Sequence, residues 1–325
     1  MFGALYYRCL EKDKTLALKV AKGSFGAKNS ISQHGIQELN WWLENLEASY
    51  NVFQHPSIDI VLYSDASTTG WGAALGEQST GGPTEAELHI NALEQQAAFF
   101  ALRSFKHSLS GKHVKLMIDN TSAVYIINNM GTSHSDNCHS ICVAIWEFCI
   151  TNKIWLTAAH LPGALNVVAD KESRRSYSDS EWMIDSNIMQ KSLSDLDFTP
   201  EIDLFASRLN NQLNAYCSYR PDPDAMYINA FSISWANLKF YSFPPFSCIL
   251  QVVQKIIQDK AAGVIVVPNW PTQAWYSLLQ PLLVKSPQTC KPSKTLLHLP
   301  ACQTQSHPLH KKLELHICLV SGKDS

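Results

Sequence analysis

Residues 61–75 read VLYSDASTTGWGAAL, an apolar strand that ends in a carboxylate and continues into a segment of small residues and glycines. Asp65 follows Ile60 and Leu62, so the acid stands at the carboxyl end of an element that is otherwise buried. A turn-forming aspartate is the ordinary explanation for such a residue. A functional interpretation therefore requires other acids that are placed to join Asp65.

The composition is that of a folded, nearly neutral chain. The 325 residues are 46% apolar and 17% charged, with a formal net charge of −2. This is enough apolar material for about two domains of ordinary size. Because the net charge gives no bulk attraction to polyanions, nucleic-acid binding would depend on local patches such as the lysines of residues 11–28. A solvated helix face explains those lysines equally well.

Targeting signals are not apparent in this sequence. Nine cysteines occur without a C-x-x-C pair, and no apolar run approaches the roughly 18 residues that a membrane span needs. The first ten residues lack the apolar core of a signal peptide. We therefore expect an intracellular protein of the cytoplasm or nucleus, with reduced thiols and no membrane partner. The sequence carries no signal for an oligomeric state.

The order of predicted elements indicates an α/β domain over residues 56–176. Strands that follow one another directly tend to pair antiparallel, and strands joined through a helix tend to pair parallel. We therefore expect a mixed five-stranded sheet with flanking helices. The predicted elements are strands at 58–65, 70–76 and 84–90, a helix at 90–105, a strand at 113–119, helices at 120–130 and 135–153, a strand at 154–161 and a closing helix from Asn166.

The remaining segments divide into an N-terminal helical part, a linker, a second unit and a tail. Residues 1–55 are predicted to be helical, with Leu39, Trp42, Leu43 and Leu46 on one packing face. Residues 177–200 read as a polar linker with a short helix around Trp182. Residues 201–284 predict a smaller α/β domain, and residues 285–325 predict a poorly ordered tail.

Four acids are placed to meet at one edge of the first predicted sheet. Asp65 and Asp119 each end a strand, Glu94 lies on the helix between them, and Asp170 lies in the first turn of the last helix. Taken singly, Glu94 is a surface residue and Asp170 a favourable charge near a helix N-terminus. Taken together they would repel one another unless cations neutralised them. The pattern therefore predicts two Mg²⁺ or Mn²⁺ ions about 3.5–4 Å apart and hydrolysis of a phosphodiester by water.

His160 stands ten residues before Asp170, at the start of the segment HLPGALNVVAD. A loop at this point can bring an imidazole to the attacked phosphate. A lone histidine at a strand end is more often structural, so His160 depends on the acids for its functional interpretation.

Four segments resemble the ribonuclease H domain of retroelement polyproteins, and retrotransposons of the DIRS type most closely. They cover about residues 56–176 and read YSDAS with GWGA, INALEQQAAFFAL, MIDNTSAV and HLPGALNVVADKESR. The resemblance implies that Asp65, Glu94, Asp119 and Asp170 bind metal. It also implies that His160 is a catalytic-loop histidine.

The same resemblance implies a substrate, the RNA strand of an RNA/DNA hybrid. A protein distinguishes this strand by its 2′-hydroxyl groups. Gly70 and Gly72 would let the backbone approach the nucleic acid, and Asn120 and Asn166 would also bind it. Residues 1–55 resemble the thumb or connection of a reverse transcriptase, and the sequence has no Y-x-D-D polymerase signature. The competing hypothesis is a catalytically inactive nucleic-acid-binding remnant.

Residues 201–284 resemble the phage-type adenine methyltransferase-like domain that follows ribonuclease H in DIRS-type elements. The resemblance rests on IDLFASRLNNQLNAYCS, YSFPPFS and GVIVVPNWPTQAWY. It implies a Rossmann-like fold, with Asp203 in the cofactor segment and a loop that grips adenine. That loop reads Phe243, Pro244, Pro245 and Phe246. Because Phe243 has no acceptor for the exocyclic amine, we expect neither S-adenosylmethionine as a cofactor nor the alternative activity of an adenine-N6 DNA methyltransferase.

Overall fold

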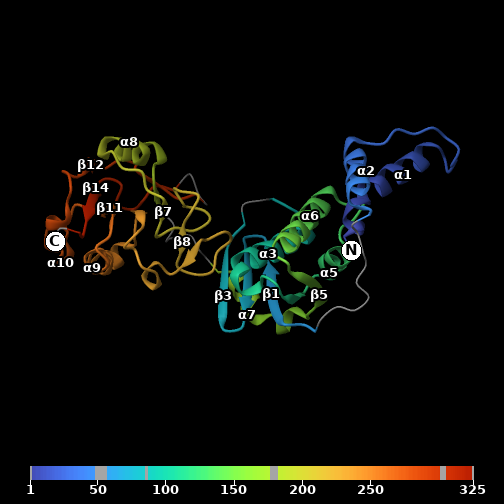
Figure 1. Ribbon diagram of the computed structural model, residues 1–325, viewed down its shortest axis with the longest axis horizontal. Coiled ribbons are helices and arrows are strands. Elements are labelled where there is room, and N and C mark those ends of the chain that lie inside the picture. Colours follow the sequence, from blue (N-terminus) through green and yellow to red (C-terminus); the bar gives the residue numbers. More distant parts are fainter. Residues whose placement is uncertain (1, 48–56, 85–86, 176–181, 301–304, 324–325) are drawn as a thin grey trace. The chain divides into compact units, whose positions relative to one another are not determined.

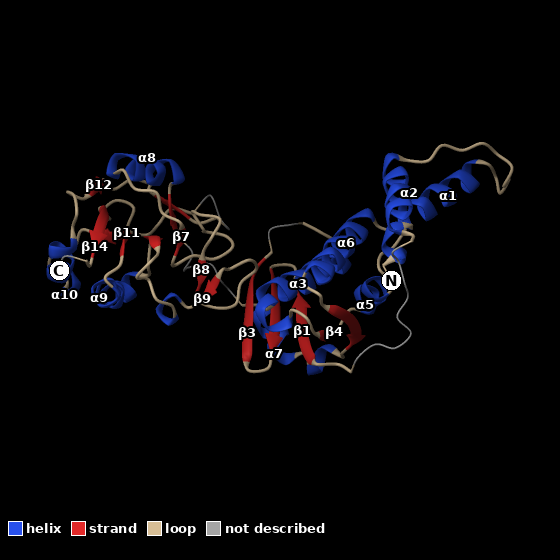
Figure 2. Ribbon diagram, viewed as in Figure 1, coloured by secondary structure: helices blue, strands red, loops and turns tan. Residues whose placement is uncertain are grey.

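The computed structural model describes residues 2–47, 57–84, 87–175, 182–300 and 305–323. The chain divides into two compact units, Met1–Arg175 and Ser176–Ser325. Figure 1 follows the chain through its labelled elements, and Figure 2 shows that each unit combines helices with strands.

The first unit is built on a five-stranded sheet with the strand order β3-β2-β1-β4-β5. β1 pairs antiparallel with β2 and parallel with β4, so the expected mixed five-stranded sheet is confirmed. The elements of this unit are the 3₁₀ helix η1 (Gly3–Tyr6), α1 (Arg8–Val20), α2 (Gln33–Asn45), β1 (Ile60–Ala66), β2 (Gly70–Leu75), β3 (Gln78–Pro83), α3 (Ile90–Ser104), α4 (Lys106–Leu109), β4 (His113–Ile118), α5 (Thr121–Asn128), α6 (Asp136–Thr151), β5 (Trp155–His160), η2 (Gly163–Leu165) and α7 (Val167–Ser173).

Helices cover both faces of this sheet, as β2 illustrates. Side chains alternate between the two faces along a strand. The ring of Trp71 packs on Phe100 of α3, with 5.2 Å between the ring centroids. The flanking Gly70 and Gly72 face α7, and a Cβ atom at Gly72 would overlap the carbonyl oxygen of Ala169. Only glycine therefore lets α7 pack this closely on β2.

The N-terminal residues belong to the same compact unit. Leu5 is buried in the core that β1, β4, α3, α5 and α6 form. The ring of Phe2 lies 5.8 Å from that of Trp146 on α6. Residues 2–47 therefore pack as part of the first unit, and their relation to a thumb or connection of a reverse transcriptase stays a prediction.

Two expectations for this unit are corrected. The third strand is β3, a polar, glycine-containing strand that a hydrophobic pattern does not reveal. Of the predicted strand 84–90, residues 84 and 87–89 form no strand, Ile90 begins α3, and residues 85–86 lie outside the described residues. β3 follows a tight turn in which Gly76 has a φ of +59°, a conformation that favours glycine. Of the packing face predicted on α2, Leu39 and Leu46 are exposed and Leu43 is 82% exposed. Trp42 is half-buried, and its Nε1 donates a 2.9 Å hydrogen bond to the carbonyl oxygen of Tyr6.

The second unit also has a five-stranded mixed sheet, with the order β12-β14-β11-β10-β7. β7, β10 and β11 are parallel, and β14 is antiparallel to both of its neighbours. The elements are β6 (Met183–Ile184), α8 (Ser186–Leu196), β7 (Ile202–Asp203), β8 (Cys217–Ser218), β9 (Tyr227–Ile228), η3 (Ala230–Ser232), β10 (Lys239–Ser242), η4 (Phe246–Cys248), α9 (Ile249–Asp259), β11 (Ala262–Pro268), α10 (Ala274–Leu279), η5 (Gln280–Leu282), β12 (Gln288–Cys290), β13 (Leu297–His298) and β14 (Leu315–Ser321).

Alternation along β11 places a hydrophobic layer on each face of this second sheet. Ile265 joins the cluster that contains Val253 of α9. The next residue, Val266, joins the cluster that contains Met189 of α8. The second unit is therefore a mixed α/β domain with helices on both faces. Its relation to methyltransferases stays a prediction.

The expected linker and tail are both parts of the second domain. β14 pairs with β11 from Leu315 to Ser321, so the expectation of a poorly ordered tail is wrong for these residues. The helix expected around Trp182 begins at Ser186 instead, and it packs onto the sheet through Met189. In the described ranges, the helices are too short or too polar to cross a membrane.

Candidate metal centre

Three of the four predicted acids meet at one edge of the first sheet. Asp65 lies near the carboxyl end of β1, and Asp119 directly follows β4. These strands are parallel and Tyr63 pairs with Met117, so each acid lies two residues beyond that pair. Glu94 reaches the same edge from the second turn of α3. Carboxylate oxygens of the three acids all lie within 4.8 Å of one another.

Burial and mutual repulsion favour the protonated forms of these acids. Asp65 and Glu94 are each only 3% exposed. Burial, followed by the charges of Asp119 and Asp65, raises the pKa of Glu94 to about 9. Burial also raises the pKa of Asp65 to about 6, although a hydrogen bond from Ser173 opposes the change. Without a cation, the cluster therefore holds at least one proton near neutral pH.

The oxygen atoms of this cluster suit a hard divalent cation. Glu94 Oε2 is buried and has no hydrogen-bond partner among the described residues. All three side chains offer carboxylate oxygen, which Mg²⁺ and Mn²⁺ prefer. A cation among them would satisfy the partnerless oxygen and relieve the repulsion between the carboxylates. The residues present therefore fit the predicted metal.

Asp170 lies outside the group of three. It is in the first turn of α7, and its Oδ1 accepts a 2.6 Å hydrogen bond from Arg174 Nε one turn later. Its charge still contributes to the raised pKa of Asp65. Asp170 is therefore an electrostatic neighbour of the three acids that the structure brings together, and its role as a metal ligand stays a prediction.

His160 is exposed at the end of β5, and it pairs with Ile118, the residue before Asp119. The loop that follows His160 passes beside the cluster. A Cβ atom at Gly163 would lie 3.0 Å from Asp119 Oδ2, so this loop touches the carboxylate. The catalytic role of His160 stays a prediction.

The predicted nucleic-acid-binding residues differ in their accessibility. Gly70 and Gly72 are buried beneath α7, so the close approach that they allow is to a helix of the same chain. Asn166 is 2% exposed, and its Nδ2 donates a 2.9 Å hydrogen bond to the carbonyl oxygen of Ser64. Burial speaks against direct contact between nucleic acid and these three residues. They position β1, β2 and α7 instead.

Asn120 is half-buried and links two of the elements that carry acids. Its Oδ1 accepts a hydrogen bond from the backbone N–H of Ala123 and so caps α5. Its Nδ2 donates a 3.0 Å hydrogen bond to Asn91 Oδ1 at the start of α3. Asn120 therefore ties the segment after Asp119 to the helix that carries Glu94.

Sequence reasoning missed Ser173. Its hydroxyl donates a 2.6 Å hydrogen bond to Asp65 Oδ2, and the residue is fully buried. The available signal was its position three residues after Asp170, which places both on neighbouring turns of α7. Asn91 was missed as well, although it lies one turn before Glu94 on α3.

In the second unit, Asp203 ends β7 next to the predicted methyltransferase-like loop. Asp203 pairs in register with Tyr241 of β10, so the acid and the loop both lie at the carboxyl ends of these two parallel strands. Burial raises the pKa of Asp203 to about 7. Its carboxylate accepts hydrogen bonds from the backbone N–H groups of Phe205 (3.3 Å) and Gln212 (3.1 Å).

The aromatic residues of that loop pack on their neighbours. The ring centroids of Phe243 and Phe246 lie 6.3 Å apart, and Phe246 lies 5.2 Å from Trp270 in an edge-on contact. Pro244 is buried and Pro245 is exposed. The cavity bounded by Asp203 and Phe243 has a volume of about 10 Å³, which is room for no more than about one water molecule.

Comparisons with known proteins return similar solved structures. No protein-family model matches the chain, and no curated protein matches it significantly. The chain is similar to ribonuclease H1 of the halophilic archaeon Halobacterium salinarum, with 19% identity, a TM-score of 0.30 and coverage of 34% of this chain and 91% of that one. It is similar to LC11-RNase H1 in complex with an RNA/DNA hybrid, with 17% identity, a TM-score of 0.31 and coverage of 35% and 92%. A foamy viral protease-reverse transcriptase in complex with an RNA/DNA hybrid shows 11% identity, a TM-score of 0.27 and coverage of 50% and 28%.

Proposed function

We propose that the first unit is a metal-dependent nuclease that hydrolyses the RNA strand of RNA/DNA hybrids. The observation that carries the proposal is the meeting of Asp65, Glu94 and Asp119, with the buried and partnerless Oε2 of Glu94 among them. Bound Mg²⁺ or Mn²⁺ would supply positive charge that activates water and stabilises the attacked phosphodiester. The choice of a hybrid as substrate rests on the sequence motifs that resemble retroelement ribonucleases H.

The acids have different roles in this proposal. Asp65 and Asp119 are the central ligands, because the ends of paired strands hold them rigidly. Glu94 completes the group from α3. Asp170 stands at its margin, bound to Arg174. The exposed His160 assists proton transfer or product release from its loop.

Incubation of the purified chain with a hybrid labelled on its RNA strand tests these roles. In Mg²⁺ the parent should cleave the RNA strand, and Asp65→Asn or Asp119→Asn should remove nearly all activity. His160→Ala should retain measurable residual activity, because acid–base assistance is typically worth a factor of about 10²–10⁴ in rate. Asp195→Asn, which changes an exposed carboxylate on α8, is the matched control. Equal losses from the first three variants would contradict this division of roles.

The competing function is a remnant that binds nucleic acid without cleaving it. If the parent leaves the RNA intact in both Mg²⁺ and Mn²⁺, and Asp119→Asn behaves the same, the enzyme proposal is wrong. Hybrid binding that persists in a gel-shift assay would then favour the remnant. Duplex RNA and duplex DNA, run alongside, establish whether cleavage is restricted to the hybrid.

We propose further that the chain derives from a retrotransposon polyprotein of the DIRS type and that its second unit is related to adenine methyltransferases without transferring methyl groups. The motifs of both units support the origin. The apolar Phe243 supports the inactivity, because a site built to hydrogen-bond an amine loses most discrimination without the partner. Incorporation of label from S-adenosylmethionine into DNA by the parent would overturn this. A gain only in Phe243→Asn would indicate an intact cofactor pocket.

A further inference from the structure

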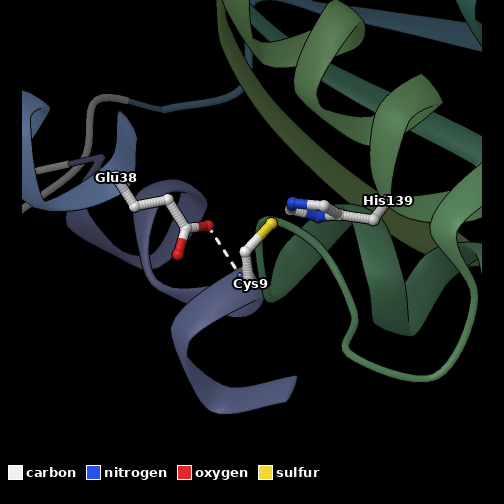
Figure 3. A group of neighbouring side chains, drawn as sticks. All are labelled: Cys9, Glu38 and His139. Carbon is white, nitrogen blue, oxygen red and sulfur yellow. Dashed lines mark hydrogen bonds between the residues drawn. The ribbon is translucent and has the colours of Figure 1, made fainter. Parts of the chain in front are cut away.

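A second group of metal-ligand side chains lies in the first unit, apart from the acidic cluster. Cys9 is on α1, Glu38 on α2 and His139 on α6. One ligand atom from each of the three lies within 4.8 Å of the others. Figure 3 shows the sulfur of Cys9 lying between the carboxylate of Glu38 and the imidazole of His139. Thiol, carboxyl and imidazole groups thus converge from three separate helices.

Helix capping fixes the position of Glu38. Its two carboxylate oxygens accept 2.9 Å hydrogen bonds from the backbone N–H groups of Cys9 and Leu10, at the start of α1. These N–H groups have no partner within their own helix. Capping explains why this glutamate is buried. It also holds the carboxylate beside the Cys9 thiol, and each carboxylate oxygen keeps a further lone pair.

The surroundings of His139 favour a neutral ring. Burial lowers the pKa of His139, although the charge of Glu38 opposes the change. Neutral imidazole is the form that binds metals. The Nδ1 atom is buried, and it makes no hydrogen bond to any residue that the structure describes. A Cβ atom at residue 131 would lie 2.6 Å from this Nδ1, so Gly131 leaves room for the ring.

The charges around Cys9 favour a cation over a free thiolate. Burial, followed by the charge of Glu38, raises the pKa of Cys9 to about 11, and Asp13 and Asp136 act in the same direction. A thiol that stays protonated is a poor nucleophile, so these surroundings do not suit a cysteine–histidine catalytic pair. The same negative charges attract a metal ion, which would stabilise the thiolate. Two cations also act on His139. Arg8 is held in an ion pair with Glu11, and Lys12 in an ion pair with Asp136.

We propose that Cys9, Glu38 and His139 bind a zinc ion that fastens α1 and α2 to α6. Sulfur, nitrogen and oxygen ligands suit Zn²⁺, whereas Mg²⁺ takes oxygen ligands. The thiolate and the carboxylate balance the charge of the ion, and the thiol proton leaves to solvent on binding. Zinc bonds of about 2.0–2.3 Å place ligand atoms roughly 3.3–3.8 Å apart, so small side-chain rotations suffice. Water would complete the tetrahedron.

Cobalt(II) is the probe that tests this site, because cobalt bound to a thiolate shows a charge-transfer absorption. The full chain is titrated with Co²⁺ in a large excess of Mg²⁺, which occupies the acidic cluster. The parent should bind cobalt with the thiolate band, and Zn²⁺ should abolish the band by displacement. Cys9→Ser should lack the band, and His139→Ala should bind cobalt at least about tenfold more weakly. Glu38→Gln, which retains an oxygen for capping, should also weaken binding.

Controls separate this site from other thiols and from general instability. Cys248→Ser changes a half-buried cysteine of the second unit and should keep the band. Zn²⁺ should raise the melting temperature of the parent and of Cys248→Ser, but not that of His139→Ala, which retains every cysteine. A parent without a thiolate band, or a Cys9→Ser variant that keeps it, overturns the proposal. Loss of nuclease activity bears on the acidic cluster and leaves this test unaffected.

Discussion

The raised pKa of Glu94 predicts that a metal ion must displace a proton to bind the acidic cluster. The metal binds ionised carboxylates, whereas the metal-free cluster keeps Glu94 protonated up to a pKa of about 9. Asp65 is already ionised above its pKa of about 6. Between these two pKa values, each rise of one pH unit lowers the proton's competition with the metal about tenfold. This is worth about 1.4 kcal/mol in the apparent free energy of metal binding. The apparent affinity for Mn²⁺ should therefore rise about tenfold per pH unit over this range and level off above it.

Titration calorimetry measures this competition directly. Near neutral pH, Mn²⁺ binding should release close to one proton per chain, read from the binding enthalpy in buffers of different ionisation heat. Glu94→Gln carries no such proton, so its affinity should be independent of pH over the same range and lower than that of the parent at alkaline pH. Glu77→Gln, in the exposed turn between β2 and β3, should behave as the parent does.

Two results would refute this reasoning. One is an affinity for Mn²⁺ that does not change between about pH 6 and pH 9, and the other is a Glu94→Gln variant whose affinity keeps the pH dependence of the parent.

The stability of the metal-free chain gives an independent measure of the raised pKa of Glu94. A carboxyl whose pKa is raised on folding binds more protons in the folded state, so the free energy of unfolding should fall as pH rises from about 4 to 9. Mn²⁺ should remove most of that fall.

Two predictions test the packing inside each unit. Gly72→Ala should destabilise the first unit by about 1–3 kcal/mol or more, because the new methyl group overlaps the backbone of Ala169. Gly26→Ala, with open space around it, should change the melting temperature little; equal effects would contradict the packing of α7 on β2. Removal of residues 305–325 should abolish the protease resistance of the second unit, because β14 lies between β11 and β12. A truncated unit that remains resistant would show that the strand is dispensable.

The sequence predicts the acidic cluster because the positions of its members follow from local rules. Asp65 and Asp119 end apolar strands, and parallel strands bring their carboxyl ends to one edge. Ser173 could not be found in this way. Its contact with Asp65 depends on how α7 lies across the sheet, and that depends on the absence of side chains at Gly70 and Gly72. The presence of a glycine in the sequence does not indicate which other segment will pack against it.

The sequence misjudges segments whose structure comes from tertiary pairing. β3 contains glycine and serine and has little strand propensity of its own, and its pairing with β2 makes it a strand. Residues 315–321 lie in a segment with scattered proline, histidine and lysine, which resembles a disordered tail. Burial against β11 decides their structure instead. In both cases the determining interaction is with residues distant in the sequence.

The zinc site shows the same limit for helices. Cys9 and Glu38 are 29 residues apart, and no metal-binding motif connects them with each other or with His139. A strand that ends in an acid indicates where the acid points, whereas a single residue on an amphipathic helix does not indicate its neighbour. The folded chain thus presents two ligand sets of different hardness. Oxygen donors at the sheet edge suit Mg²⁺ or Mn²⁺, and a thiol with an imidazole suits zinc, so the two proposed sites can be loaded and tested separately.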